Sequence, residues 1–208
     1  MCIRDSAGVD PQTLATVFSS SGGEGSNCHS LCETLASPDP LISPTRFTNS
    51  VHNAASGYWH IAVGSRCSST SLCAYDGSFG AGLIEAATLM HTNAEPLLLV
   101  AYDLPYPEPL NSVRPLPDNL GIALVLTPSP TSRSIAELRV ELLPARLAAP
   151  VDSCGDASLD ALRTGMPAGA ALPMLQGLAR GLDRAPHELV LDYLPQLKLK
   201  VRLAAVRA

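Results

Sequence analysis

Residues 69–90 are predicted to form a short strand that runs through a sharp turn into a helix, and this stretch constrains the fold more than any other part of the chain. Alternating side chains before the turn predict the strand, and apolar residues at three- and four-residue spacing after it predict a helix with one buried face. These residues are Phe79, Leu83, Ala86, Ala87 and Met90. A strand that enters a helix in this way is a common place for a reactive group, because the positive end of the helix stabilises an anion there.

The turn itself contains Asp76 and Gly77. An aspartate at this position can accept hydrogen bonds from the first free amides of the helix. Residues 80–82 are Gly, Ala and Gly, which remove side-chain bulk from the first helical turn. We therefore expect another backbone or an extended ligand to approach the helix closely there.

Composition excludes several classes of function. The formal net charge of -5 comes without a basic stripe, which argues against nucleic-acid binding. No apolar run approaches the roughly twenty residues that span a bilayer, and no secretory signal opens the chain, so a cytoplasmic protein is expected. Six cysteines at irregular positions do not suggest a disulfide scaffold, and six free thiols are expected.

Two short motifs invite a binding function that their spacing does not support. Three glycines between positions 22 and 25 follow a predicted strand over 14–19, but their spacing fits neither the dinucleotide-binding nor the P-loop fingerprint. Cys28-His29 with Cys32 resembles half of a zinc site, yet no second ligand pair follows at a suitable distance. Cys28 and Cys32 are one helical turn apart on the apolar face of a predicted helix, so we expect them to be buried in its packing.

The segment before the central unit is predicted to be extended over 41–47 and helical from about Thr48 or Asn49 to residue 63. His52 and Asn53, near the start of this helix, could bind a polar ligand or fix the neighbouring loop by hydrogen bonds. Trp59, the one tryptophan, is expected to be a packing anchor.

The second half of the chain is predicted to add strands and short helices. A nearly continuous apolar run predicts a buried strand over 96–101, which ends in a proline-rich loop. Further strands are expected at 121–127 and 135–143, which a turn over 128–134 would pair as a hairpin. Helices are expected at 158–163 and 172–182, and closing strands at 187–194 and 197–203. The last strand alternates Leu or Val with Lys or Arg, which predicts one solvent-facing side at a sheet edge.

Three stretches, in this order, resemble a small family of β-ketoacyl-synthase-like proteins described as chain-length factors and associated with aryl polyene and related pigment pathways of bacteria. They are Ser-Pro-Thr-Arg-Phe-Thr-Asn-Ser-Val-His-Asn-Ala-Ala-Ser-Gly-Tyr-Trp at 43–59, Ala-Tyr-Asp-Gly-Ser-Phe-Gly-Ala-Gly-Leu-Ile-Glu-Ala at 74–86, and Leu-Leu-Val-Ala-Tyr-Asp at 98–103. The match covers about residues 9–127. The resemblance implies an α/β, thiolase-like fold, layered α/β/α with a mixed central sheet of about five strands, equal to about half of a ketosynthase.

The same resemblance divides the chain into three parts. Residues 1–8 are expected to be a truncated or non-native start, and 9–127 the ketosynthase-like N-terminal core. Residues 128–208 would then be a family-variable C-terminal extension packed on that core.

In active ketosynthases a nucleophilic cysteine lies at the strand-to-helix turn, and two histidines from the C-terminal half complete the site. The resemblance places Asp76 on or beside the position of that cysteine, and a carboxylate cannot accept an acyl chain from a thioester. A slip of three residues would make Cys73 the nucleophile instead. No His-Gly-Thr motif follows, and His187, the one histidine beyond the matched stretch, is interpreted as structural.

The leading hypothesis is therefore a non-catalytic subunit that pairs with an active ketosynthase, serves an acyl carrier protein, and helps to shape the cavity for the growing chain. The strand over 70–74, with Thr70 and Leu72, would supply a two-fold interface, and no cofactor or metal is expected. Further candidates for the cavity or the interface are Ser78, Phe79, His52 and Asn53.

Three alternatives stay open. The chain could be a working acyltransferase or 3-oxoacyl-carrier-protein synthase that uses Cys73. It could be a hydrolase that uses Ser78, although Gly77-Ser-Phe-Gly80 is one residue short of the nucleophile-elbow motif and no triad histidine can be assigned. It could also be a homodimeric structural protein without an acyl partner.

Overall fold

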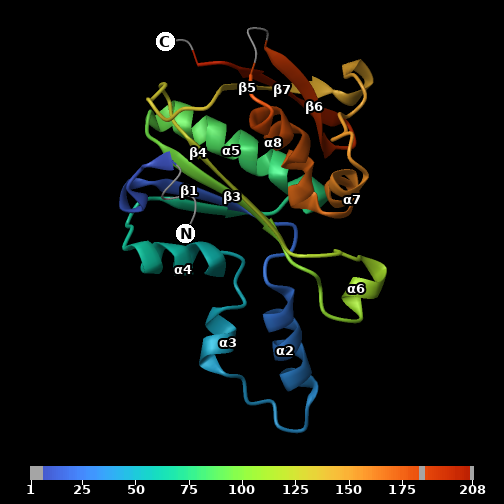
Figure 1. The fold of residues 1–208 in the computed structure, drawn as a ribbon. Helices are drawn as coiled ribbons and strands as arrows, with labels where there is room; N and C mark the ends of the chain where they lie inside the picture. Colours follow the sequence, from blue (N-terminus) through green and yellow to red (C-terminus); the bar gives the residue numbers. More distant parts are fainter. Residues whose placement is uncertain (1–6, 183–185, 207–208) are drawn as a thin grey trace.

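Two β-sheets enclose a layer of helices in the computed structural model, which describes residues 7–182 and 186–206 (Figure 1). The first sheet has the strand order β2-β1-β3-β4. Its strands are β1 (Ala15–Ser19), β2 (Ser69–Leu72), β3 (Leu97–Asp103) and β4 (Leu120–Leu126). β1 is parallel to both of its neighbours, whereas β4 runs antiparallel to β3, so the sheet is mixed as expected. In the described residues it has four strands and not the expected five or so.

The second sheet is antiparallel, with the order β5-β7-β6. It contains β5 (Glu137–Pro144), β6 (His187–Leu194) and β7 (Leu197–Ala204). Leu199, Val201 and Leu203 are buried, while the basic residues between them face outward, which confirms the alternation read from the sequence. The expected edge position is wrong, because β7 is the central strand. Alternation reports which face is buried, and it does not report how many strands flank the segment.

The expected hairpin over 121–143 is also wrong. β4 pairs with β3 in the first sheet, and β5 pairs with β7 in the second. The chain therefore crosses from one sheet to the other between these two strands. Each strand pairs with a strand distant in sequence and not with the other across the local turn, because each buries its apolar side against the shared helix layer.

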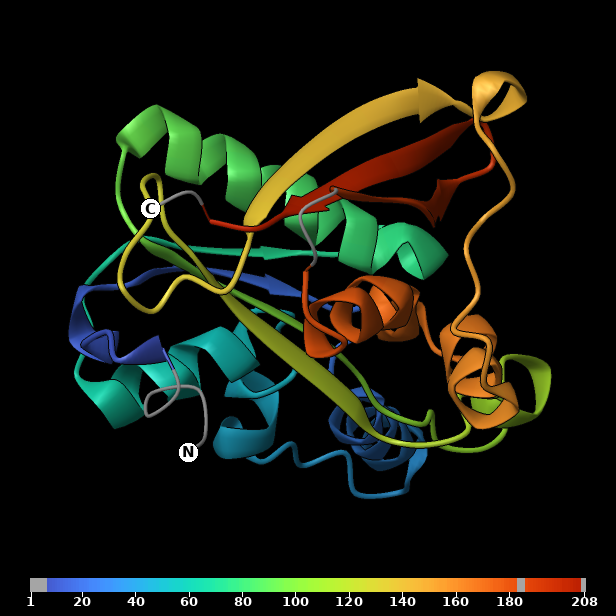
Figure 2. The same ribbon diagram turned by 45° about the horizontal axis from the view of Figure 1, so that its top comes forward.

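That layer contains α5 (Ser78–Asn93) and α8 (Leu172–Ala179), the latter preceded by a 3-10 turn, η4 (Pro167–Ala171). Phe79, Leu83 and Ala86 of α5 are fully buried in the core. α4 (Ala54–Val63) covers the opposite face of the first sheet, as Figure 2 shows. The layered α/β/α arrangement is thus confirmed, and the second sheet adds a further layer beyond α5.

An arm formed by α2 (Gly25–Ala36) and α3 (Pro44–Thr48) extends away from this body (Figure 1). The predicted extended segment over 41–47 is therefore helical in part, because Pro44 occupies the first helical position and the Ser43 hydroxyl accepts a bond from the Arg46 amide. The predicted helix start near Thr48 is correspondingly wrong, since α4 begins at Ala54.

The position of α2 in the arm also explains why the expected burial of Cys28 and Cys32 is wrong. Cys28 and Cys32 are exposed, and only Leu31 of α2 is buried, because this helix packs away from the main core. Five cysteines in the described part of the chain are free, and Cys2 lies outside it.

The remaining short elements are η1 (Pro11–Thr13), η2 (Tyr75–Gly77), α6 (Leu110–Val113), η3 (Ala145–Leu147) and α7 (Ala157–Gly165). Within the described ranges, no helix combines the length and the hydropathy that crossing a membrane requires.

Candidate functional site

The turn between β2 and α5 is sharp and held by its own residues. Tyr75 has a φ of 52°, in the left-handed region that disfavours residues with a Cβ atom. The Ser78 hydroxyl donates to the Tyr75 carbonyl at 2.7 Å and accepts from the Ala74 amide at 3.0 Å. Ser78 is buried, so its hydroxyl is committed to the shape of the turn.

Asp76 lies within this turn with an exposed side chain. The expected capping bond to α5 is absent, since no side chain caps this helix. Instead, Nη2 of Arg114 donates to Oδ1 of Asp76 at 2.8 Å. The residues of the turn form a 3-10 helix that continues directly into α5, which carries the Asp76 side chain away from the free amides.

Arg114, which follows α6, is the partner that sequence analysis missed. Its Cζ lies 3.4 Å from the centroid of the Tyr75 ring and 5.8 Å from that of Tyr106. Its side chain is 15% exposed, and its Nε and Nη1 atoms are buried with no hydrogen-bond partner among the described residues. A single arginine in a proline-rich loop carries no periodic or motif signal, so only the fold brings it to the turn.

The surroundings of the turn disfavour the charged forms of both Arg114 and Asp76. Desolvation lowers the pKa of the Arg114 guanidinium, and a charge on Cys73 opposes that shift. Partial burial, followed by the charges of Asp103 and Asp192, raises the pKa of the Asp76 carboxyl even though Arg114 donates to it. The turn therefore presents a carboxylate in acidic surroundings above a largely buried cation.

Cys73 and Phe79 flank the turn and differ in exposure. Cys73 follows the end of β2, is exposed, and its Sγ donates to the Ser21 carbonyl at 3.1 Å. Phe79 is fully buried in the core cluster and so lines no open cavity. Thus Cys73, Asp76 and Ser78 come together at the turn, while Phe79 supports it from inside.

The small residues at the start of α5 admit neighbouring segments of the same chain. A Cβ atom on Gly80 would lie 2.6 Å from Cδ2 of Tyr193, and one on Gly82 would lie 2.7 Å from Cβ of Ser19. The close approach expected from the sequence therefore comes from β6 and β1.

Asp103, at the end of β3, is a buried carboxylate that joins three segments. Its Oδ1 accepts from the Ser21 amide at 2.8 Å, and its Oδ2 accepts from the Ala168 amide at 2.7 Å. It thereby fixes the segment just after β1 against η4. In this segment the Ser21 carbonyl accepts a bond from the Cys73 thiol.

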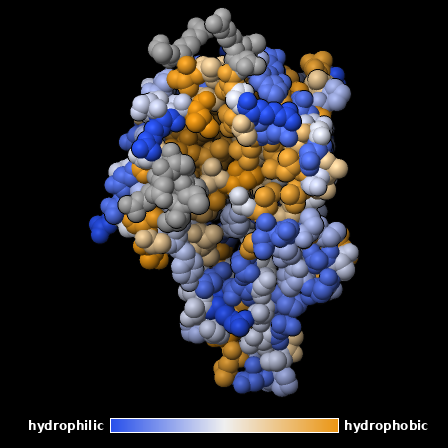
Figure 3. Space-filling model, in the orientation of Figure 1, coloured by the Kyte–Doolittle hydropathy of each residue, from blue (hydrophilic) through white to orange (hydrophobic). Residues whose placement is uncertain are grey.

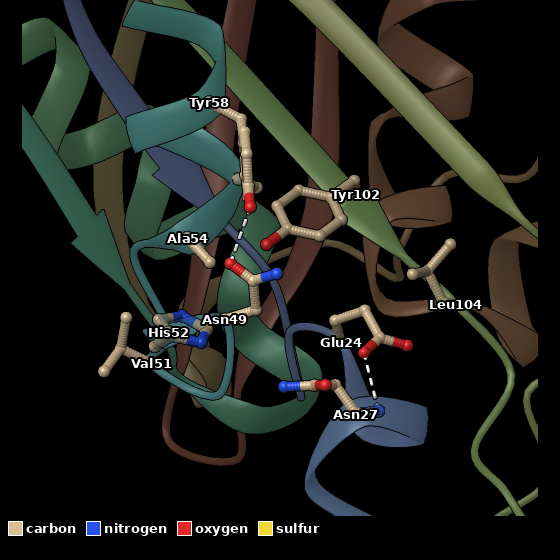
Figure 4. Close-up of a pocket in the computed structure, with 10 residues that line it drawn as sticks. Glu24, Asn27, Asn49, Val51, His52, Ala54, Tyr58, Tyr102 and Leu104 are labelled. Atoms are coloured by element: carbon tan, nitrogen blue, oxygen red, sulfur yellow. Dashed lines mark hydrogen bonds between the residues drawn. The ribbon is translucent and has the colours of Figure 1, made fainter. Parts of the chain in front are cut away.

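A pocket of about 280 Å³ lies between α2, α4 and the end of β3 (Figure 4). His52 forms part of its wall, and its Nε2 donates to the Leu72 carbonyl at 2.9 Å, which ties the pocket to the end of β2. Asn53 is exposed beside it and makes no capping bond to α4. The pocket is lined by Glu24, Asn27, Asn49, Val51, His52, Ala54, Ala55, Tyr58, Tyr102 and Leu104.

One edge of the first sheet is open at β2. The Thr16 and Ser20 amides donate to the Ser68 and Leu72 carbonyls, so even-numbered residues of the strand, Thr70 included, turn their backbone groups toward β1. The backbone groups of the odd-numbered residues are left at the outer edge. On the nearby helices, Phe47, Tyr58 and Ile61 are exposed apolar residues.

Figure 3 shows the distribution of apolar surface on one side of the molecule. The arm is largely hydrophilic there, and apolar residues gather over the body above it. No group of three or more metal-binding side chains is found in the residues that the structure describes.

A family model described as the N-terminal domain of β-ketoacyl synthase matches residues 7–161. The chain belongs to this family. The stretch matched includes the strand-to-helix turn, the pocket and Arg114. A comparison with curated protein sequences finds no match.

Solved structures place this β-ketoacyl synthase domain among thiolase-like folds. One neighbour is a chain of the complex of the ketosynthase ApeO with its chain length factor ApeC from Xenorhabdus doucetiae, at 24% identity and a TM-score of 0.67, covering 91% of this chain and 69% of that one. The ishigamide ketosynthase/chain length factor has 14% identity and a TM-score of 0.67, covering 94% and 74%. 3-Oxoacyl-(acyl carrier protein) synthase III, FabH, from Pseudomonas aeruginosa PAO1 has 16% identity and a TM-score of 0.51, covering 98% and 80%.

Proposed function

We propose that this chain is a non-catalytic β-ketoacyl-synthase-like subunit of the chain-length-factor kind. It pairs with an active ketosynthase in fatty-acid or polyketide-type biosynthesis of the aryl polyene class. The observation that supports this proposal is the turn before α5, where Nη2 of Arg114 donates to the Asp76 carboxylate. The family resemblance puts the thiol of condensing enzymes at this turn.

A carboxylate cannot replace that thiol, because covalent transfer from a thioester needs a nucleophile that both accepts and releases the acyl group. Such nucleophiles are activated by a nearby base or a depressed pKa. Among the hydrogen bonds of the described residues, none joins a histidine ring to Cys73, Asp76 or Ser78. His52 uses its Nε2 on a backbone carbonyl.

One observation favours a second candidate, an acyltransferase that uses Cys73. Cys73 is exposed, and it follows the end of β2 directly before the turn. The hydrolase hypothesis gains no such support, because the Ser78 hydroxyl already donates one hydrogen bond and accepts another within its own turn.

The free edge of β2 supports pairing with a partner of similar fold. The backbone groups of Ser69 and Ser71 face away from β1 at this edge, and strands of two subunits can join there. Tyr58 and Ile61 are exposed on α4, the helix that covers one face of this sheet. The neighbouring solved structures that are named as ketosynthases with chain length factors agree with such an assembly.

An acyl carrier protein is the implied substrate carrier. Carrier proteins are acidic, and this chain has a formal net charge of -5. Like charges oppose docking, so the carrier docks on the catalytic subunit.

Co-expression with a ketosynthase encoded beside it tests the proposal. We expect a heterodimer by size-exclusion chromatography with light scattering, and condensation of acyl and malonyl thioesters by the pair but not by this chain alone. Ser71→Pro removes an outward amide and should abolish pairing, whereas Ser71→Ala, which keeps that amide, should not. Condensation by the isolated chain, lost on Cys73→Ser, would replace the proposal with the Cys73 enzyme.

A further inference from the structure

We propose that the pocket between α2, α4 and the end of β3 binds a neutral head group that donates a hydrogen bond, such as a hydroxyl. This inference goes beyond the proposed function, because it concerns the chemistry of the pocket whether or not the chain pairs with a ketosynthase.

The size of the pocket limits the ligand. Its volume of about 280 Å³ equals roughly nine water molecules at their share of liquid volume, and lies just below the common range for ligand cavities, about 300–1,000 Å³. Val51, Ala54, Ala55 and Leu104 supply apolar wall. These dimensions fit one ring or a short chain with a single polar end.

The polar part of the wall includes hydrogen-bond acceptors at the start of α2. The two oxygens of Glu24 accept from the amides of Ser26 and Asn27 at 3.2 and 2.7 Å, at the start of α2. A carboxylate offers about four lone-pair sites, so it can accept a further bond. The Asn27 Nδ2 donates to the Arg46 carbonyl at 2.7 Å, which leaves its Oδ1 as another acceptor.

The hydrogen-bond donors that Tyr58, Tyr102 and the asparagines bring to the wall are neutral, so they do not offset the charge of an anion. The Tyr58 hydroxyl donates to Oδ1 of Asn49 at 2.8 Å. Burial raises the pKa of the Tyr102 phenol, which is therefore protonated at neutral pH, and Ser20 is its hydrogen-bond partner. In Figure 4 the hydroxyls of Tyr58 and Tyr102 lie near the side-chain amide of Asn49, and the carboxylate of Glu24 lies apart from them at the start of α2.

The lining discriminates among head groups by charge and by hydrogen bonding. Its ten residues include no lysine or arginine, so an anionic head would meet Glu24 without a compensating cation. A purely apolar head would displace water from the Glu24 and Asn27 acceptors without replacing its hydrogen bonds. An ammonium head would lose part of its hydration on binding. The Glu24 carboxylate would compensate for this loss only in part, because it already accepts two backbone amide bonds. A neutral donor satisfies the acceptors without these penalties.

The test compares probes that share one ring and differ at one end. Binding of p-cresol, toluene, 4-methylbenzoate and 4-methylbenzylammonium to the full chain is measured by isothermal titration calorimetry and ligand-observed NMR. We expect p-cresol to bind at least about tenfold more tightly than each of the others, which corresponds to one hydrogen bond to a charged group.

Two variants locate the binding. Glu24→Gln should weaken p-cresol binding about tenfold, while Glu33→Gln, the same change at an exposed position of the same helix, should leave it unchanged. Ala55→Leu should fill the pocket and abolish binding, while Ala62→Leu on the exposed side of α4 should not. Circular dichroism verifies that each variant is folded.

Equal or tighter binding of toluene, 4-methylbenzoate or 4-methylbenzylammonium would overturn the inference, as would p-cresol binding that survives both Glu24→Gln and Ala55→Leu. A chain that pairs with a ketosynthase but does not bind p-cresol overturns this inference alone. A chain that binds p-cresol but condenses thioesters by itself overturns the proposed function alone.

Discussion

The guanidinium of Arg114 lies over the ring of Tyr75, with its Cζ 3.4 Å from the ring centroid. Tyr75 is the residue with left-handed backbone in the turn before α5, and the same guanidinium donates to Asp76, the next residue. One side chain from a distant loop thus contacts both residues that define the turn. The stack and the ion pair offset the cost of burying two guanidinium nitrogens without partners.

Because these contributions oppose one another, Arg114→Met should change the free energy of unfolding by no more than about 1 kcal/mol. Urea unfolding measures this, with Arg139→Met at an exposed position as the control. A loss of more than about 3 kcal/mol would show that the cation is a main support of the fold, contrary to this reasoning.

Asp103→Asn should destabilise the chain by about 2–4 kcal/mol. The amide would turn a donor toward the amide of Ser21 or Ala168, both of which now donate to the carboxylate. Asp118→Asn, at an exposed position with one local bond to Asn119, should stay within about 0.5 kcal/mol of the parent. Similar denaturation midpoints for the two variants would contradict the role given to Asp103.

Two glycine substitutions in helices should have opposite signs. Gly82→Ala should cost about 1–3 kcal/mol, because its Cβ would overlap Ser19 in a packed core. Gly57→Ala should stabilise by about 0.5–1 kcal/mol, because nothing lies within 4 Å of the added atom. Thermal unfolding of both variants measures the difference, and a stabilised Gly82→Ala protein would refute the packing described for α5.

Asp160 should make stability depend on pH. The hydrogen bond from Arg163, together with that from the Cys154 amide, lowers the pKa of the Asp160 carboxyl below its usual 3.8. A folded-state pKa below the unfolded one adds stability above the unfolded value, which is lost as pH falls through the folded value. The stability difference between the parent and Asp160→Asn should thus be constant from pH 7 to roughly pH 5 and shrink below about pH 4. A difference that grows on acidification would contradict the shift.

Asp76→Cys should place a thiol at the turn without creating a condensing enzyme. Asp76 is exposed, so iodoacetamide should label the new cysteine in a Cys73→Ser background, as detected by mass spectrometry. Decarboxylative condensation should stay at background, because no histidine hydrogen-bonds to the turn in the described structure. Asp76→Ser is the unlabelled control, and turnover by the isolated Asp76→Cys chain would contradict the expectation that a thiol at this turn is not sufficient for condensation.

Much of the central unit could be read from the sequence because its signals are local. The apolar spacing of Phe79 and Leu83 placed α5 on the core, and the continuous run over 96–101 gave a buried strand. Cys28 and Cys32 show the limit of such reasoning. Their spacing defines one side of α2, but burial depends on what packs against that side, and the arm leaves them exposed.

The sequence by itself determined the strand, turn and helix around Asp76 and the resemblance to β-ketoacyl synthases, because both depend on residues adjacent in the chain. Only the tertiary structure decided that β4 and β5 belong to different sheets, that β7 is central, and that Arg114 reaches Asp76. Each of these features is a contact between residues distant in sequence, and the energy of such a contact depends on how the whole chain packs.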